Sequence, residues 1–202
     1  MPLSKSGVRE SVPWVRIPPS PPFDIIRIMN LYPLIFSDGT EFYKELGKTF
    51  VQHNKGLFIL APSGAGKTHF CKNQEEPHWI DGDDVWMGAH AHPEGAWWEE
   101  SLEVINRVDQ RSDVITMEAK TQGFWIMGAS NFWLRPDAIV IPDWDTHKIY
   151  ISHRQHNNYD GGATEDSLDQ VRSHIEVIKK WHTDHDVPMF KDIQTAVKHL
   201  TN

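Results

Sequence analysis

Short, almost continuous apolar runs alternate along the chain with stretches of helical hydrophobic spacing. Such runs are typical of strands that are buried on both faces of a parallel sheet. They predict five strands, at 56–61, 78–81, 124–127, 138–141 and 187–190. The helical spacing predicts helices at 41–53, 67–73, 97–110, 114–122, 167–182 and 192–200. We therefore expect an α/β fold, a three-layer sandwich with helices on both faces of a five-stranded parallel sheet.

The first segment, 1–28, differs in composition from the rest of the chain. Six of the thirteen prolines fall within residues 1–22, without a periodic apolar pattern, so this segment is expected to be disordered. Residues 15–18, Val-Arg-Ile-Pro, resemble the translation of part of a transfer RNA gene. This resemblance predicts that the start codon was assigned too far upstream and that Met29 is the first residue of the protein. The alternative is a proline-rich arm that binds an SH3-like partner. Residues 29–202 are expected to form one domain.

Composition narrows the function classes. Hydrophobic residues make up 39% of the chain and charged residues 24%, enough to bury a core. No run reaches the ~18 apolar residues of a membrane helix, so a soluble, cytoplasmic protein without a membrane partner is expected. The single cysteine, Cys71, excludes an internal disulfide. The formal net charge of −8 disfavours nucleic acid and favours a small anionic ligand in a dedicated pocket.

A glycine-rich motif follows the first predicted strand and precedes a predicted helix. It matches the Walker A pattern, with alanine at the leading position, and consists of Ala61, Pro62, Ser63, Gly64, Ala65, Gly66, Lys67 and Thr68. The glycines of such a loop let backbone N–H groups turn toward phosphate, and the start of the helix adds partial positive charge. The motif predicts an ATP site with an exposed Lys67 on the β- and γ-phosphates and with Thr68 on Mg²⁺.

Three aspartates follow the second predicted strand: Asp81, Asp83 and Asp84. Because the carboxyl ends of parallel strands meet at one edge of a sheet, we expect these side chains beside the glycine-rich loop. A carboxylate there can hold Mg²⁺ or accept a proton from an attacking hydroxyl. We expect Asp81 to lie in the Mg²⁺ shell, Asp83 to be the catalytic carboxylate on the acceptor side, and Asp84 to cap a helix. The alternative for each is a purely structural helix cap.

The chain resembles P-loop kinases of the nucleoside-monophosphate-kinase-like fold in three features. These are the glycine-rich loop, the Asp81-Gly82-Asp83 segment and the lack of an acid after the third strand. From Lys55 onward the pattern is most similar to shikimate and gluconate kinases and to adenylyl-sulfate kinase. The resemblance implies Mg²⁺ on the first aspartate, the acceptor hydroxyl on the second, and the acceptor against 128–130. It also implies a short helical lid around 145–165, whose Arg154 closes on the transferring phosphoryl group. Unlike shikimate kinases, this chain has no arginine soon after the aspartates for an acceptor carboxylate.

Other candidates carry weaker signals. Arg172 is a second candidate for the phosphoryl-facing arginine, whereas Arg135 is expected to be structural. Three tryptophans follow the acidic segment, either in the core or as a stacking surface for a planar acceptor: Trp86, Trp97 and Trp98. Six closely spaced histidines are expected at the surface rather than on a metal: His90, His92, His153, His156, His182 and His185. No His–Asp partner is evident for Ser63 or Ser130, so nucleophilic hydrolysis is not expected.

The sequence therefore predicts an ATP- and Mg²⁺-dependent kinase that acts, as a monomer or homodimer, on a small-molecule acceptor. A nucleoside monophosphate and a hydroxylated metabolite are both open as the acceptor. One alternative is a polynucleotide end kinase, which would require a basic groove that the net charge disfavours. A second alternative is a nucleotide-binding module without transfer activity, suggested by the missing acid after the third strand.

Overall fold

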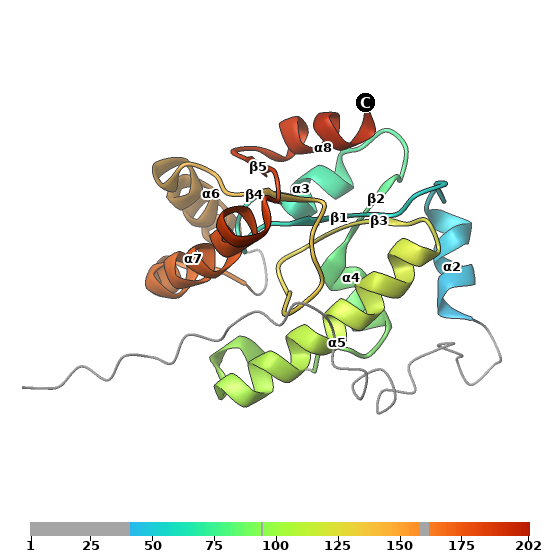
Figure 1. Ribbon diagram of the computed structural model, residues 1–202. Helices are drawn as coiled ribbons and strands as arrows, with labels where there is room; N and C mark the ends of the chain where they lie inside the picture. Colours follow the sequence, from blue (N-terminus) through green and yellow to red (C-terminus); the bar gives the residue numbers. More distant parts are fainter. Residues whose placement is uncertain (1–40, 94, 158–161) are drawn as a thin grey trace, which may run out of the picture.

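A computed structural model describes residues 41–93, 95–157 and 162–202 (Figure 1). Within them, one sheet holds five parallel strands: β1 (Leu57–Leu60), β2 (Trp79–Asp81), β3 (Trp125–Gly128), β4 (Ala138–Val140) and β5 (Met189–Phe190). Their order across the sheet is β2-β3-β1-β4-β5. The predicted α/β class and five-stranded parallel sheet are confirmed. Segment 1–28, Met29 and part of the expected lid, 158–161, lie outside the described residues.

Helices cover both faces of the sheet (Figure 1). The described residues form α2 (Phe42–Thr49), α3 (Lys67–Lys72), α4 (Gly82–Gly88), α5 (Leu102–Thr121), α6 (Trp144–His156), α7 (Leu168–His185) and α8 (Ile193–Thr201). Two short 3₁₀ segments are η1 (Trp97–Glu99) and η2 (Glu165–Ser167). In Figure 1, α3 and α8 lie on one side of the sheet and α4 and α5 on the other. This arrangement is compatible with the three-layer sandwich that the sequence predicts.

The central strand, β1, explains why the fold is layered. It pairs with β3 on one side and with β4 on the other. Leu57 and Ile59 pack in the cluster that includes α3 and α8, whereas Phe58 and Leu60 pack in the cluster with α4, α5 and α7. Successive side chains of a strand point to opposite faces, so an uninterrupted apolar run contributes to both layers at once.

Two helix predictions differ most from the structure, and a third, 167–182, ends three residues before α7 does. The helix expected at 41–53 ends at Thr49, because Phe50 is extended and the N–H of Val51 donates to the Pro77 carbonyl over 3.1 Å. The two helices expected at 97–110 and 114–122 are instead η1 followed by one helix, α5. Ser101 caps the start of α5, since its hydroxyl accepts the Val104 N–H over 3.4 Å.

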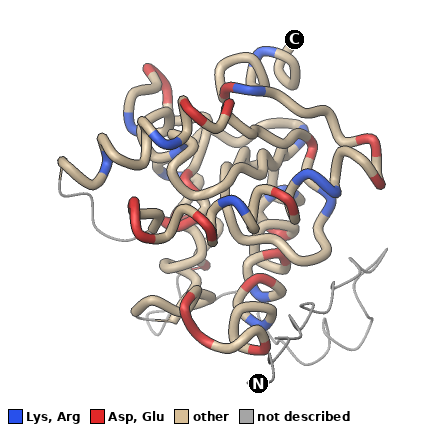
Figure 2. Tube along the Cα trace, turned by 90° about the vertical axis from the view of Figure 1, so that its left-hand side faces the viewer, with Lys and Arg blue, Asp and Glu red and all other residues tan. Residues whose placement is uncertain are grey.

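Charged residues are spread along the described chain. Figure 2 shows Lys and Arg positions interspersed with Asp and Glu positions. Several form ion pairs within a helix. Lys48 contacts Glu45 at 2.6 Å in α2, and Arg107 contacts Glu103 at 2.8 Å in α5. No helix in the described part of the chain is long and apolar enough to cross a lipid bilayer.

Candidate functional site

The glycine-rich loop leaves the carboxyl end of β1 and leads into α3. The Ala61 N–H donates to the Gly128 carbonyl over 2.9 Å, which joins the start of the loop to the end of β3. Gly64 and Gly66 have φ values of 80° and 94°, a left-handed backbone that residues with a Cβ rarely adopt. Five backbone N–H groups of the loop donate to no backbone carbonyl of the described chain: those of Ser63, Gly64, Gly66, Lys67 and Thr68. The loop therefore presents donors that an anion can use.

Lys67 is the first residue of α3, and its side chain is turned back onto the loop. The residue is only 6% exposed, so the expectation of an exposed lysine is wrong. Its Nζ donates to the carbonyls of Ala61 and Pro62 over 3.0 and 2.9 Å. Burial lowers the pKa of Lys67, while the charges of Asp83 and Asp81 act to raise it. The structure thus brings the loop lysine and the two carboxylates together.

The three aspartates differ in position. Asp81 ends β2, is 5% exposed, and caps α4 by accepting the Asp83 N–H over 3.3 Å. Asp84 lies within the first turn of α4, so the prediction that Asp84 is the helix cap is wrong. Asp83 is exposed, yet desolvation by the surrounding protein raises the pKa of its carboxyl, and Asp81 adds to the rise. One carboxylate is therefore fixed in place, and the other is available to a ligand.

Helix α6 is fastened to the glycine-rich loop through Ser63. The buried ring of His147 lies with Nε2 2.8 Å from the Ser63 carbonyl, so this nitrogen carries the proton. The hydroxyl of Ser63 accepts the Ala163 N–H over 2.9 Å. Burial lowers the pKa of His147, which fits a neutral ring. Sequence reasoning missed His147, because a lone histidine in a helical stretch carries no signal of a contact 84 residues away.

Arg154, also on α6, faces the same group of charges. Its guanidinium lowers the pKa of both Asp83 and Lys67, although in each case burial is the largest cause of the shift. A Cβ on Gly162 would lie 2.8 Å from the Nη2 of Arg154, so glycine lets the chain lie close to the guanidinium. Of the sequence candidates, Lys67, Asp81, Asp83 and Arg154 are therefore brought together.

The other arginine candidates have structural contacts instead. The guanidinium of Arg172 lies over the ring of Trp144, 5.0 Å from its centroid. Arg135 donates to the His185 carbonyl over 2.8 Å, which confirms its structural role. The charge of Arg154 shifts the pKa of Lys67 and Asp83, whereas those of Arg172 and Arg135 do not. Arg154 is thus the better supported of the two phosphoryl-facing candidates.

The tryptophans after the acidic segment fall into two groups. Trp86 is fully buried, and its indole N–H donates to the Thr116 hydroxyl over 2.9 Å. Its ring also lies against Gly82 and Gly128, where a side chain would collide with it. Trp86 is therefore a core residue. The η1 residues Trp97 and Trp98 are half-buried. Stacking on a planar acceptor therefore stays a hypothesis for these two residues and not for Trp86.

One sequence prediction near Ser130 is wrong. His92 is half-buried rather than on the surface, and its Nε2 lies 3.5 Å from the Ser130 hydroxyl. Asp109 is hydrogen-bonded to the same hydroxyl, so Ser130 does have histidine and aspartate neighbours. They do not form a nucleophile triad, because Asp109 contacts Ser130 rather than orienting His92. The three residues come from separate segments, which is why sequence spacing did not reveal them.

A buried carboxylate, that of Asp113 on α5, holds the loop that follows β3. It accepts the N–H groups of Phe132 and Leu134 over 2.8 and 3.0 Å, that of Trp133, and the side-chain amide of Asn131 over 2.9 Å. Burial raises the pKa of Asp113 to about 6, while these donors lower it. The carboxylate thereby fixes the backbone immediately after Ser130.

Asp113→Ala is therefore expected to destabilise the protein by about 3 kcal/mol, because it leaves one buried and two part-buried backbone donors without an acceptor. Urea unfolding followed by tryptophan fluorescence measures the change in the free energy of unfolding. Glu103→Ala is the matched control, since this residue is on the same helix but exposed. A loss below about 1 kcal/mol for Asp113→Ala would contradict the anchoring role.

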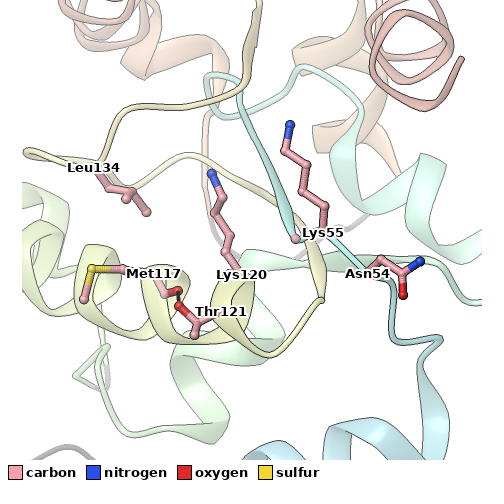
Figure 3. Close-up of a pocket in the computed structure, with 7 residues that line it drawn as sticks. Asn54, Lys55, Met117, Lys120, Thr121 and Leu134 are labelled. Atoms are coloured by element: carbon pink, nitrogen blue, oxygen red, sulfur yellow. Dashed lines mark hydrogen bonds between the residues drawn. The ribbon is translucent and has the colours of Figure 1, made fainter.

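A pocket lies at the opposite edge of the sheet, where β1 begins. Its volume is about 420 Å³, and it is lined by Asn54, Lys55, Gly56, Met117, Lys120, Thr121 and Leu134. Figure 3 shows the side chains of Lys55 and Lys120 extending in the same direction. Lys120, however, is paired with Asp137 over 2.6 Å, which neutralises its charge. The strand separates this pocket from the glycine-rich loop, so we assign the candidate site to the loop.

Two comparisons with known proteins find no match. The sequence matches no protein-family model, and no curated protein matches it significantly. The function is therefore argued from the geometry and chemistry of the site.

Proposed function

We propose that this protein is an ATP-dependent phosphotransferase that acts on a small molecule. One observation carries the proposal: Lys67 lies among Asp81, Asp83 and Arg154 where a glycine-rich loop leaves the central strand. Phosphoryl transfer requires donors and cations around the phosphates and a carboxylate beside the acceptor. This arrangement also agrees with the motif that the sequence contains. In this proposal α6 belongs to the lid around 145–165 that the resemblance implies.

The residues of the loop fit a nucleotide triphosphate. The free N–H groups of 63, 64 and 66–68 provide donors for phosphate oxygens, and a Cβ at Gly66 would meet no protein atom within 4 Å. In the proposed complex the Lys67 ammonium exchanges its hydrogen bonds with two carbonyls for hydrogen bonds with phosphate oxygens. A buried ammonium is stabilised more by charged acceptors than by neutral carbonyls, so this exchange is favourable.

The same edge of the sheet fits Mg²⁺. In the described chain no three His, Cys, Asp or Glu side chains are grouped so as to hold a metal by themselves. Thr68 and Asp81 would therefore hold Mg²⁺ together with phosphate oxygens and water, as is usual for this ion. The ion would supply positive charge to the phosphate oxygens. The neighbouring Asp83 would accept the proton of the acceptor hydroxyl, and Arg154 would add positive charge to the transferring group.

Calorimetric titration with ATP, in the presence and absence of Mg²⁺, tests the nucleotide site. We expect Mg²⁺-dependent binding that Lys67→Met abolishes, followed by ADP release when an acceptor panel is added. Failure to bind Mg·ATP would overturn the proposal. Binding without transfer to any acceptor would instead support a nucleotide-binding module, and transfer to a polynucleotide 5′ end would support an end kinase.

Arg154→Ala is expected to lower kcat by a factor on the order of 10², with a much smaller effect on the affinity for Mg·ATP. The guanidinium faces Asp83 and Lys67, where the proposed transfer takes place. A positive charge in this position stabilises the transition state more than bound Mg·ATP, because negative charge develops on the transferring group. Steady-state kinetics with varied ATP separates kcat from KM. Arg107→Ala is the control, because Arg107 pairs with Glu103 on the exposed side of α5. An unchanged kcat with a raised KM for ATP would make Arg154 a ground-state contact.

A further inference from the structure

One face of α6 packs against the glycine-rich loop. His147, Ile151 and Arg154 recur at the spacing that places side chains on the same face of a helix. His147 and Ile151 are both fully buried. A Cβ on Gly64 would lie 2.6 Å from Cγ1 of Ile151 and 3.3 Å from Nε2 of His147, so the helix lies close to the loop backbone at this glycine. The backbone N–H of Gly64 is one of the free donors of the loop, so α6 contacts the loop where phosphate would bind.

Ser63 bonds to two points that lie on either side of Arg154 in the sequence. Its carbonyl accepts the Nε2–H of His147 over 2.8 Å, and its hydroxyl accepts the Ala163 N–H over 2.9 Å. A Cβ on Gly162 would lie 2.8 Å from the Ser63 hydroxyl oxygen and 2.8 Å from Nη2 of Arg154. Because both atoms lie close to the same point, the guanidinium lies near the loop hydroxyl. The two hydrogen bonds of Ser63 therefore fix the place of Arg154 relative to the loop.

Packing alone does not account for a histidine at position 147. The Nδ1 of His147 is buried and has no hydrogen-bond partner in the described part of the chain. A buried acceptor without a donor costs free energy, and a leucine would fill much of the same space without that cost. What the imidazole supplies, and an apolar side chain does not, is the N–H that it donates to the Ser63 carbonyl. The hydrogen bond to the loop is therefore the distinctive contribution of this residue.

The surroundings of His147 keep its ring neutral. Burial lowers the pKa of His147, and the charge of Lys67 lowers it further, while the hydrogen bond to Ser63 acts in the opposite direction. A second ring proton would lie on Nδ1, where the described residues offer no acceptor. The ring therefore adds no charge to the site near pH 7. Its contribution to the site is to hold α6 in place rather than to stabilise charge.

We propose that His147 is a positioning residue, which holds Arg154 against the transferring phosphoryl group through its hydrogen bond to Ser63. This inference rests on the proposed transfer function. Arg154 lies about two helical turns beyond His147, so a shift of α6 where His147 meets the loop also displaces the guanidinium. The effect of a charge on a transition state depends on its distance and direction, and a displaced guanidinium stabilises the transferring group less. His147 thus acts through Arg154 and contacts no reacting atom.

Aluminium fluoride bound together with Mg·ADP mimics the transferring phosphoryl group, so it tests the inference before the acceptor is identified. Calorimetry on the full chain measures the Kd of Mg·ADP with and without aluminium fluoride. We call the factor by which aluminium fluoride lowers this Kd the fluoride ratio. The wild type is expected to show a fluoride ratio of about 10² or more, because transition-state analogues bind more tightly than ground-state ligands.

A double-mutant cycle separates positioning from a structural role. His147→Leu and Arg154→Ala are each expected to lower the fluoride ratio about tenfold, and the double variant to lower it no further than Arg154→Ala alone. His147→Gln keeps an N–H that reaches the Ser63 carbonyl, so it is expected to recover most of the ratio. His153→Leu, at an exposed position of the same helix, is the matched control and is expected to keep the wild-type ratio. Thermal unfolding shows which variants are folded. If His147→Leu does not fold, Ser63→Ala, which removes the bond to the Ala163 N–H, takes its place in the cycle.

The outcomes distinguish this inference from the proposed function. An unchanged fluoride ratio in the folded His147→Leu or Ser63→Ala protein overturns the inference and leaves the kinase function standing. An equal loss in the wild-type and Arg154→Ala backgrounds does the same, because His147 or Ser63 would then act independently of Arg154. A wild type that binds Mg·ATP without any effect of aluminium fluoride also overturns it, since no transferring group is then stabilised. Failure of the wild type to bind Mg·ATP overturns the proposed function and, with it, the inference.

Discussion

Lys67→Ala is expected to lower the rate of phosphoryl transfer by a factor on the order of 10³ or more. In the proposed function its Nζ is the cation that the loop itself supplies to the β- and γ-phosphates. A preorganised charge directed at the transferring group contributes on the order of 10²–10³ in rate, and the loss of ground-state contacts adds to this. ADP release under saturating acceptor measures the transfer rate, and calorimetry measures the affinity for Mg·ATP.

The burial of Lys67 requires a second variant. Because the side chain is only 6% exposed and bonds two loop carbonyls, alanine would leave a void and two acceptors without a donor. Lys67→Met keeps most of the volume and removes the charge, so it is expected to unfold at a temperature close to that of the wild type and to be equally inactive. Lys48→Ala, at an exposed ion pair of α2, is the control. Full activity in a folded Lys67→Met protein would refute the role of the loop.

The strands were predictable because their signal is local. Each of the five predicted runs overlaps one strand of the sheet, and the bounds differ by at most two residues, as in 138–141 against Ala138–Val140 and 124–127 against Trp125–Gly128. An apolar run whose side chains are buried on both faces of the sheet largely determines which residues form the strand. The glycine-rich loop was predictable for the same reason, since its glycines, lysine and threonine are neighbours in the sequence.

The rest of the site depends on contacts between distant segments. His147 reaches Ser63 across 84 positions, and the cluster around Ser130 draws its members from α5, the end of β3 and the segment before η1. Helix capping was misjudged because Asp81, Asp83 and Asp84 are equally suitable by residue type. Only the backbone shows that the chain turns at Asp81, the residue that ends β2. Spacing alone therefore identified the acidic segment but not the role of each acid.

Asp83→Asn is expected to lower kcat by ~10²–10⁴ with the affinity for Mg·ATP nearly unchanged. Asparagine keeps the size and hydrogen bonding of the side chain but cannot accept the acceptor's proton. Asp83 is exposed, whereas Asp81 is buried and bonded to the α4 backbone, so Asp83 is the carboxylate that an acceptor hydroxyl can approach. Asp84→Asn, one position along the same turn, is the matched control and is expected to retain most of the activity.

The pH profile provides a second readout of the same prediction. A general base works only when deprotonated, so activity falls as the pH drops through its pKa. Desolvation raises the pKa of Asp83, and the charge of Asp81 adds to the rise, so the acid limb of kcat/KM is expected above the ordinary carboxyl range. Asp83→Asn should remove this limb, whereas Asp84→Asn should keep it.

Asp81→Asn is expected to act differently, by raising the Mg²⁺ concentration required for half-maximal activity. Its carboxylate ends β2 and acts on the charge of Lys67, and in the proposed function it binds the ion rather than the acceptor. Titrations of acceptor and Mg²⁺ on both asparagine variants therefore distinguish the two acids, because excess Mg²⁺ should restore Asp81→Asn but not Asp83→Asn. If the acceptor is already a phosphate, no base is needed, and Asp83→Asn would mainly raise the acceptor KM. If only Asp81→Asn slows transfer at saturating Mg²⁺, the base is Asp81 and the division of roles is reversed.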